Sequence, residues 1–136
     1  MQIDHIGYAV KNIQNAAVIF RILGFSQLKE PTFDPIQGLW ISLVTNENQV
    51  IELISPDAHK ASIVDRLLSA NGPTPYHLCF STENIEQELE MLSGQGFRKI
   101  SKTVPTDIFE GRRMCFLYHK EIGLIELLEN DKRNGE

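Results

Sequence analysis

The chain reads HIGYAVKNI at residues 5–13 and HLCFSTENI at residues 77–85, so one pattern of His, apolar residues and Asn-Ile returns after 72 residues. The same interval of 72 residues separates Gly24-Phe25 from Gly96-Phe97. A register that holds over this distance is typical of an internal repeat. The repeat predicts two copies of one module in tandem.

A second repeated motif lies near the end of each module. IELI at residues 51–54 matches IELL at residues 125–128 after 74 residues, which indicates two extra residues in a loop. Each module therefore carries one His near its start and one Glu near its end. Two modules related by a pseudo-twofold axis would bring these side chains together as a divalent-metal site with open coordination positions. The candidate ligands are His5, Glu52, His77 and Glu126.

Hydrophobic periodicity predicts a βαβββ unit in the first module, about residues 1–56. Residues 2–10 have strand composition, and Asn12 is a candidate N-cap for a helix that ends at Gly24. Polar and proline-rich turns then divide the rest of the module. The three strands that complete it are expected at residues 25–30, 38–45 and 49–55, with turns at 31–35 and 46–48.

The second half repeats this scheme after a connector helix at about residues 58–72. Its apolar residues between 62 and 70 have helical spacing, and NGPTP at residues 71–75 ends it. The second module is expected at about residues 75–129, followed by a frayed tail at 130–136. Its elements are a strand at 76–82, a helix at 85–94 capped by Asn84, and strands at 97–102, 112–118 and 122–129.

Strand alternation places the candidate ligands on apolar faces. Glu52 shares its face with Val50 and Ile54, and Glu126 likewise has apolar neighbours two residues away. A carboxylate on such a face is costly unless it is paired, protonated or coordinated. Taken singly, each His is more often a core residue and each Glu an exposed one. Their recurrence at equivalent positions favours a metal site.

Composition limits the classes of partner. The chain has 136 residues, enough for a single domain spanning residues 1–136, and 42% of them are hydrophobic. A net charge of −5 with interspersed signs gives no basic surface for nucleic acid or anionic lipid. No apolar stretch has membrane-spanning length, so we expect a cytoplasmic protein. Cys79 and Cys115 lack metal-site spacing and are expected to be buried thiols.

These motifs together resemble the vicinal oxygen chelate superfamily, which includes glyoxalase I, methylmalonyl-CoA epimerase, extradiol dioxygenases and bleomycin-resistance proteins. The similarity is strongest to its epimerase and glyoxalase members and extends over nearly the whole chain. The stretches that carry it are DHIGYAVKNI at 4–13, ELISP at 52–56, SI at 62–63 ahead of NG at 71–72, YHL at 76–78 and GLIELLE at 123–129.

The resemblance implies an α+β fold of two tandem βαβββ modules that form a cupped mixed sheet around a central metal site. His5, Glu52, His77 and Glu126 stand at the family's ligand positions, and the ion would be Zn, Ni, Co, Mn or Fe. It also implies a metal-dependent lyase or isomerase that enolises a small carbonyl or acyl-thioester substrate, with Glu126 or Glu52 as the base, and a homodimer.

Two departures leave the substrate open. The epimerases that the chain resembles carry a Glu just before the Gly of the third strand, whereas this chain has Ile36 there and only Glu30 and Asp34 nearby as alternative acids. The Arg that glyoxalase I uses for the glutathione carboxylate is also missing after His5. Phe33, Trp40, Met114 and Phe116 are pocket candidates, with core packing as the alternative. The competing class is a metal-free protein that sequesters a small ligand, of the bleomycin-resistance type.

Overall fold

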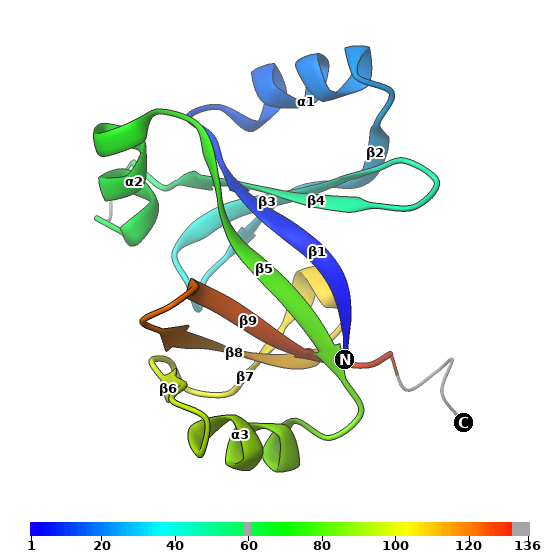
Figure 1. Ribbon diagram of the computed structural model, residues 1–136. Coiled ribbons are helices and arrows are strands. Elements are labelled where there is room, and N and C mark those ends of the chain that lie inside the picture. The colour runs from blue at the N-terminus through cyan, green and yellow to red at the C-terminus, as the bar shows by residue number, and fades with distance from the viewer. Residues whose placement is uncertain (59–60, 132–136) are drawn as a thin grey trace. The chain divides into compact units, whose positions relative to one another are not determined.

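The structure, a computed structural model, describes residues 1–58 and 61–131. It has the expected α+β fold, and the strand-helix-strand order of the first half recurs in the second half (Figure 1). Two compact units make up the chain: one is His5–Tyr76, and the other joins Met1–Asp4 with the chain from His77 onward. The second of these units resumes at His77, which is also the first residue of the second copy of the repeat.

The first module has a four-stranded sheet with the strand order β2-β3-β4-β1. β1 runs parallel to β4, whereas β2 with β3 and β3 with β4 are antiparallel pairs. Helix α1 contacts β2, β3 and β4 and covers one face of this sheet (Figure 1). The elements are β1 (Gln2–Ala9), α1 (Ile13–Ile22), β2 (Ser26–Asp34), β3 (Leu39–Thr45) and β4 (Val50–Pro56).

Local signals in the sequence place α1. The Asn12 side chain accepts a hydrogen bond from the Asn15 backbone N–H at 2.8 Å, which confirms the expected N-cap. Gly24 follows the helix with a φ of 97°, and Gly96 has a φ of 93° at the equivalent position of the second module. These left-handed conformations favour glycine, which explains why the repeat retains it at both places.

The core of each module lies between its helix and its sheet. In the first module it is built from Val10, which follows β1, and from buried residues of α1, β3 and β4: Ile13, Val44, Ile51 and Leu53. In the second module the equivalent cluster is Ile85, Leu92, Cys115, Leu117, Ile125 and Leu127. The two faces of each sheet are therefore distinct, because the helix covers only one of them.

The connector helix and the second module follow the expected order. Ser62 caps α2 (Ile63–Asn71) in a capping box with Asp65; residues 59 and 60 of the expected connector lie outside the described residues. The sheet order is β5-β9-β8-β6, with β7 also paired to β8. The elements are β5 (Thr74–Thr82), α3 (Ile85–Ser93), β6 (Arg98–Lys99), β7 (Val104–Thr106), the short 3-10 helix η1 (Asp107–Phe109), β8 (Arg112–His119) and β9 (Gly123–Glu129).

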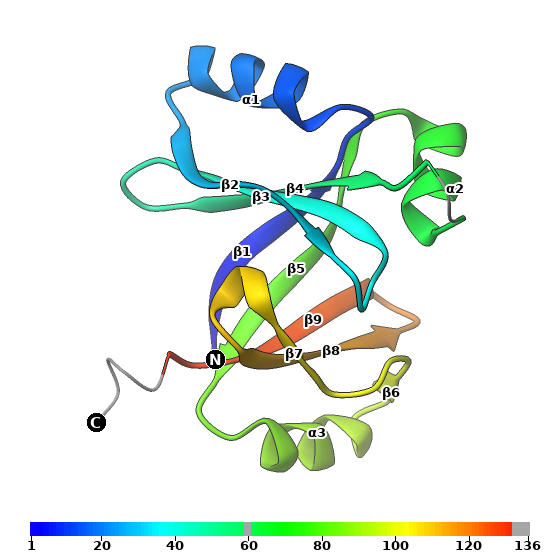
Figure 2. The same cartoon turned by 180° about the vertical axis from the view of Figure 1, so that it is seen from behind.

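The expected strand at 97–102 is wrong in its extent. The structure has two short strands, β6 and β7, that lie along the same edge of β8 (Figure 2). Between them the Ser101 hydroxyl, rather than a backbone carbonyl, accepts the Phe116 N–H at 2.8 Å. This side-chain acceptor interrupts the backbone ladder and splits the strand.

The first module has a comparable irregularity in β2. Its register against β3 shifts twice, between Gln27 and Lys29 and between Lys29 and Thr32. The extra residues let β2 continue to Asp34, so the expected turn at 31–35 begins only after that residue.

The expectation of a frayed tail from residue 130 is wrong at its start, because the Asn130 N–H donates to the Thr82 carbonyl at 2.8 Å. Residues 132–136 lie outside the described part.

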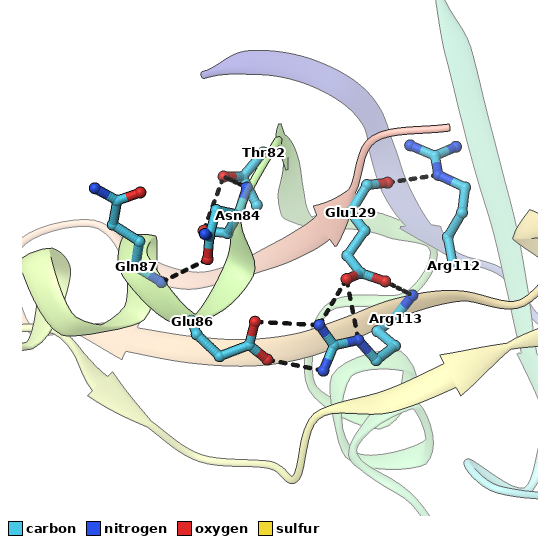
Figure 3. Close-up of polar contacts among 7 residues, drawn as sticks. All are labelled: Thr82, Asn84, Glu86, Gln87, Arg112, Arg113 and Glu129. Atoms are coloured by element: carbon cyan, nitrogen blue, oxygen red, sulfur yellow. Dashed lines mark hydrogen bonds and ion pairs between the residues drawn. The ribbon is translucent and has the colours of Figure 1, made fainter. Parts of the chain in front are cut away.

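An ion-pair cluster fixes the end of β9 to its neighbours (Figure 3). Arg113 on β8 donates to the buried Glu129 carboxylate at the end of β9, with contacts of 2.7 and 3.0 Å. The same guanidinium reaches Glu86 in the first turn of α3 at 2.7 Å. The hydrogen bonds that the guanidinium donates to these two carboxylates raise the pKa of Arg113 and lower the pKa of Glu86. The cluster therefore ties α3 to the sheet.

We predict that Glu86→Gln lowers the stability of the protein at pH 7 but not at low pH. The hydrogen bond from Arg113 holds the pKa of Glu86 below its ordinary value of 4.5. The stability that this carboxylate contributes is therefore present above that ordinary value and is lost as the pH falls through the folded pKa. Urea unfolding of both proteins at a series of pH values measures the difference. A stability difference that persists unchanged to pH 2 would contradict this role, and Glu83→Gln, at an exposed acid of the same module, is the control.

Candidate functional site

The first module brings His5 and Glu52 together. β1 and β4 are parallel neighbours in which Gly7 pairs with Glu52, so His5 lies two residues earlier on the same face. The His5 Nε2 atom is 3.2 Å from Glu52 Oε1, and the two side chains are 0% and 5% exposed. The first pair of candidate residues is therefore a buried imidazole-carboxylate contact on the sheet face opposite the α1 core.

The second module builds the same pair from the equivalent strands. β5 and β9 are parallel, Cys79 pairs with Glu126, and His77 again lies two residues before the paired position. The distance from His77 Nε2 to Glu126 Oε1 is 2.9 Å, and both side chains are buried. The repeat seen in the sequence thus corresponds to two copies of one structural arrangement.

In each module the neighbouring antiparallel strand places an aromatic or apolar side chain opposite the Glu of the pair. Phe116 on β8 pairs with Glu126, and its ring meets His77 edge-on with a centroid distance of 5.3 Å. In the first module Leu43 on β3 occupies the corresponding place opposite Glu52. The sequence singled out Phe116 but not Leu43, because an aliphatic residue in a strand has no signal that separates a site wall from ordinary core.

Stability alone does not explain these buried pairs. Removing a carboxylate and an imidazole from water costs several kcal/mol per charged group, and an apolar pair of similar volume is often equally stable or more so. Both imidazole nitrogens and carboxylate oxygens are ligands of divalent first-row metals. Each of the two buried pairs, His5 with Glu52 and His77 with Glu126, therefore supplies donors of the kind that bind such an ion.

The remaining candidates divide into structural and exposed residues. Asp34 accepts hydrogen bonds from the Ile36 and Gln37 N–H groups and from the Gln37 side chain, so its carboxylate holds the turn before β3. Glu30 is exposed, as is Ile36 itself in that turn. The sequence analysis named Glu30 and Asp34 as acids that could replace the one missing at Ile36. Of these two, Asp34 already accepts hydrogen bonds from the neighbouring backbone.

The other pocket candidates and the thiols also differ in environment. Met114 is buried, whereas Phe33 and Trp40 are partly exposed and contact each other with a centroid distance of 5.4 Å. Cys79 and Cys115 are buried free thiols, as expected, and burial raises the pKa of Cys115. In the part of the chain that the structure describes, no helix has the length and apolar character to cross a membrane.

The chain belongs to the family described as the Glyoxalase/Bleomycin resistance protein/Dioxygenase superfamily, whose family model matches residues 4–116. The resemblance seen in the sequence predicted this fold, with duplicated modules and a His and a Glu in each.

The chain is also similar in sequence to two epimerases. The chain is 25% identical over 128 residues to an ethylmalonyl-CoA/methylmalonyl-CoA epimerase of Cereibacter sphaeroides, with coverage of 93% of this chain and 96% of the relative. It is also 25% identical to human mitochondrial methylmalonyl-CoA epimerase, covering 93% of this chain and 72% of that protein.

Solved structures show the same fold. Methylmalonyl-CoA epimerase from Mycobacterium tuberculosis superposes with a TM-score of 0.82 at 24% identity, covering 98% of this chain and 90% of that one. A Streptomyces coelicolor epimerase gives a TM-score of 0.83 at 23% identity, with coverage of 97% and 96%.

Proposed function

We propose that this protein is a divalent-metal-dependent enzyme that epimerises an acyl thioester by removing the proton next to the thioester carbonyl. The observation that carries this proposal is the pair of equivalent buried His-Glu contacts, one in each module. The epimerase names of the relatives support the reaction class. A solved relative contains methylmalonyl-CoA, which supports a substrate of the coenzyme A thioester type.

In this proposal His5, Glu52, His77 and Glu126 hold one metal ion together. A bound divalent cation would polarise the carbonyl oxygen of the substrate and so lower the barrier to loss of the neighbouring proton. Two His and two Glu leave coordination positions open for that oxygen. Zn, Ni, Co, Mn and Fe all accept such a mixed set, so the donor chemistry does not select among them.

The carboxylates are the proposed acid and base. In each pair the carboxylate lies against the His Nε2, and in this proposal Glu52 or Glu126 accepts a proton from the substrate. Epimerisation needs removal of a proton from one face of the carbon and delivery to the other. Equivalent carboxylates from the two modules supply both tasks, which compensates for Ile36 at the position where the related epimerases carry an acid.

The duplicated donor set predicts that all four residues contribute to metal binding. We expect His5→Ala, Glu52→Ala, His77→Ala and Glu126→Ala each to lower metal affinity by at least about 100-fold, because each removes one of four ligands. Elemental analysis of the purified proteins and titration with Co²⁺ measure this. Removing the metal should also lower the melting temperature, since an ion at 100 times its Kd adds about 2.7 kcal/mol of stability.

Two exposed acids provide the controls for this experiment. Glu47→Ala and Glu83→Ala change one carboxylate in each module without touching a His-Glu pair. Both variants should keep the metal content of the unchanged protein. Full metal occupancy in His5→Ala and His77→Ala would contradict the assignment.

The reaction class predicts exchange of the substrate proton with solvent. The metal-loaded protein is incubated in deuterated water with methylmalonyl-CoA and other 2-substituted acyl thioesters. Deuterium should then appear next to the substrate carbonyl, and mass spectrometry measures its uptake. Glu126→Gln and Glu52→Gln should lose the exchange, by about 100-fold or more if each carboxylate is a general base or acid.

Two further outcomes of the exchange experiment are informative. Exchange with the hemithioacetal of methylglyoxal and glutathione, but with no thioester, would assign a glyoxalase reaction instead. Tight binding of an unreacted ligand with no exchange would place the protein among the sequestering members of the superfamily.

We also propose a homodimer, in line with the expectation from the sequence. Helix α1 exposes large apolar side chains, with Ile22 76% and Leu23 65% exposed, next to the exposed Val18 and Ile19. Such a patch is typical of a surface that another protein covers. Sedimentation at micromolar concentration should give twice the 15.5 kDa chain mass, and Ile22→Lys should shift it to the monomer. A monomer for the unchanged protein would contradict the proposal.

A further inference from the structure

In each module the residue that faces the Glu of the His-Glu pair lies beside an irregularity in the neighbouring edge of the sheet. In the second module this residue is Phe116 on β8, and it lies at the break between β6 and β7. In the first module it is Leu43 on β3, which pairs with Lys29, and the register of β2 shifts on both sides of Lys29. The two modules therefore share an irregularity at one position of the sheet.

At the break in the second module, a side chain and a loop residue supply the hydrogen bonds of Phe116. β6 pairs as far as Leu117 and β7 pairs from Met114, so Phe116 lies in the gap between them. The Phe116 N–H donates to the Ser101 hydroxyl at 2.8 Å, and the Phe116 carbonyl accepts the Ile100 N–H at 3.0 Å. The segment between the two short strands thus fixes the backbone of Phe116.

In the first module the Gln27 side chain supplies the equivalent hydrogen bond. Its amide donates to the Leu43 carbonyl at 3.2 Å and also to the Ser42 hydroxyl. The buried Ser42 hydroxyl in turn donates to the Lys29 carbonyl at 2.8 Å. Bulges of this kind are frequent next to active sites, where they change the direction of a side chain. Side-chain hydrogen bonds thus hold β3 to its edge strand at the residue that faces Glu52.

The hydrogen bonds of Phe116 also determine how closely its side chain approaches Glu126. Both backbone groups of Phe116 point toward the β6 and β7 edge, away from β9, so Phe116 and Glu126 form a non-hydrogen-bonded antiparallel pair. Side chains approach more closely in such pairs than in hydrogen-bonded ones. The Phe116 ring meets the His77 imidazole edge-on, with an interplanar angle of 83°. Phe116 therefore neighbours both members of the second pair.

We infer that each irregularity positions the residue that faces the Glu, and that Phe116 in this way holds the His77 imidazole toward Glu126. The torsion that turns an imidazole about its Cβ–Cγ bond is broad, and an edge-on aromatic contact restricts it. A ligand held in its binding orientation loses less freedom when a metal binds, a consequence that rests on the proposed function. Phe116 is a positioning residue in this proposal, because it supplies no donor atom.

NMR spectra of the histidine side chains in the metal-free protein test the positioning directly. Ser101→Ala should shift the His77 ring signals in the same direction as Phe116→Leu, because both weaken the ring contact. Ser101→Thr keeps the hydroxyl and should retain the original signals. Ser93→Ala is the matched control, since its exposed hydroxyl donates within α3. Unchanged His77 signals in Ser101→Ala would overturn the proposal.

The first module provides an independent version of the same experiment. Gln27→Met removes the amide that donates to the Leu43 carbonyl but keeps a side chain of similar length. It should shift the His5 ring signals, through Leu43 and Glu52, and leave those of His77 in place. The control is Gln14→Met, at an exposed glutamine of α1. A His5 shift no larger than in this control would overturn the shared role of the two irregularities.

Binding of Co²⁺ measures what the positioning contributes to the proposed metal centre. Phe116→Leu should weaken Co²⁺ binding about tenfold, as expected for a residue that orients a metal ligand, and should change the absorption spectrum of the bound ion. Ser101→Ala should weaken it about fivefold, the effect of one hydrogen bond, and Ser101→Thr should restore it. Lower resistance of these variants to urea with unchanged Co²⁺ affinity and spectrum would indicate a purely structural role and overturn the proposal.

The two kinds of measurement separate this inference from the proposed function. If the unchanged protein binds no Co²⁺, the proposed metal centre fails, and the His77 signals of the metal-free protein still decide whether Ser101 and Phe116 position the imidazole. If Co²⁺ binds but Ser101→Ala leaves both the His77 signals and the affinity unchanged, the metal centre stands and the positioning role is rejected.

Discussion

In each module a glutamate carboxylate is buried against a histidine imidazole, and the register of the sheet depends on keeping that contact. A slip of one residue between β1 and β4 would turn Glu52 into the apolar core under α1 and move Leu53 to the other face. The same slip between β5 and β9 would bury Glu126 among the core residues under α3. The position of the candidate ligands and the packing of the two cores therefore depend on one register.

Two glutamates of β9, Glu126 and Glu129, have partners of different kinds. Glu126 and Glu129 are three residues apart, so they face opposite sides of the sheet. Glu129 is held by Arg113, a cation that stays charged, and this contact joins β8, β9 and α3. Glu126 meets His77 instead, and an imidazole can release its proton or bind a metal near neutral pH. Glu129 therefore ties parts of the fold together, whereas Glu126 is one of the candidate metal ligands.

This chain differs from the epimerases that it resembles in the turn before β3. The turn before β3 places Ile36 in solvent and uses Asp34 for its backbone hydrogen bonds, so that region contributes no free acid beyond the exposed Glu30. The proposed function therefore assigns the acid and base roles to the paired glutamates of the two modules.

The sequence alone determined the duplication, both helix caps, the glycines after α1 and α3, and the four candidate ligands, because repetition and strand alternation act over short stretches. It missed the break between β6 and β7, since that break depends on a Ser101 hydroxyl that bonds to a distant strand. Only the tertiary structure decided that His5 Nε2 lies 3.2 Å from Glu52 Oε1 and that His77 Nε2 lies 2.9 Å from Glu126 Oε1. Those facts depend on strand pairings between residues far apart in the chain, which local patterns do not encode.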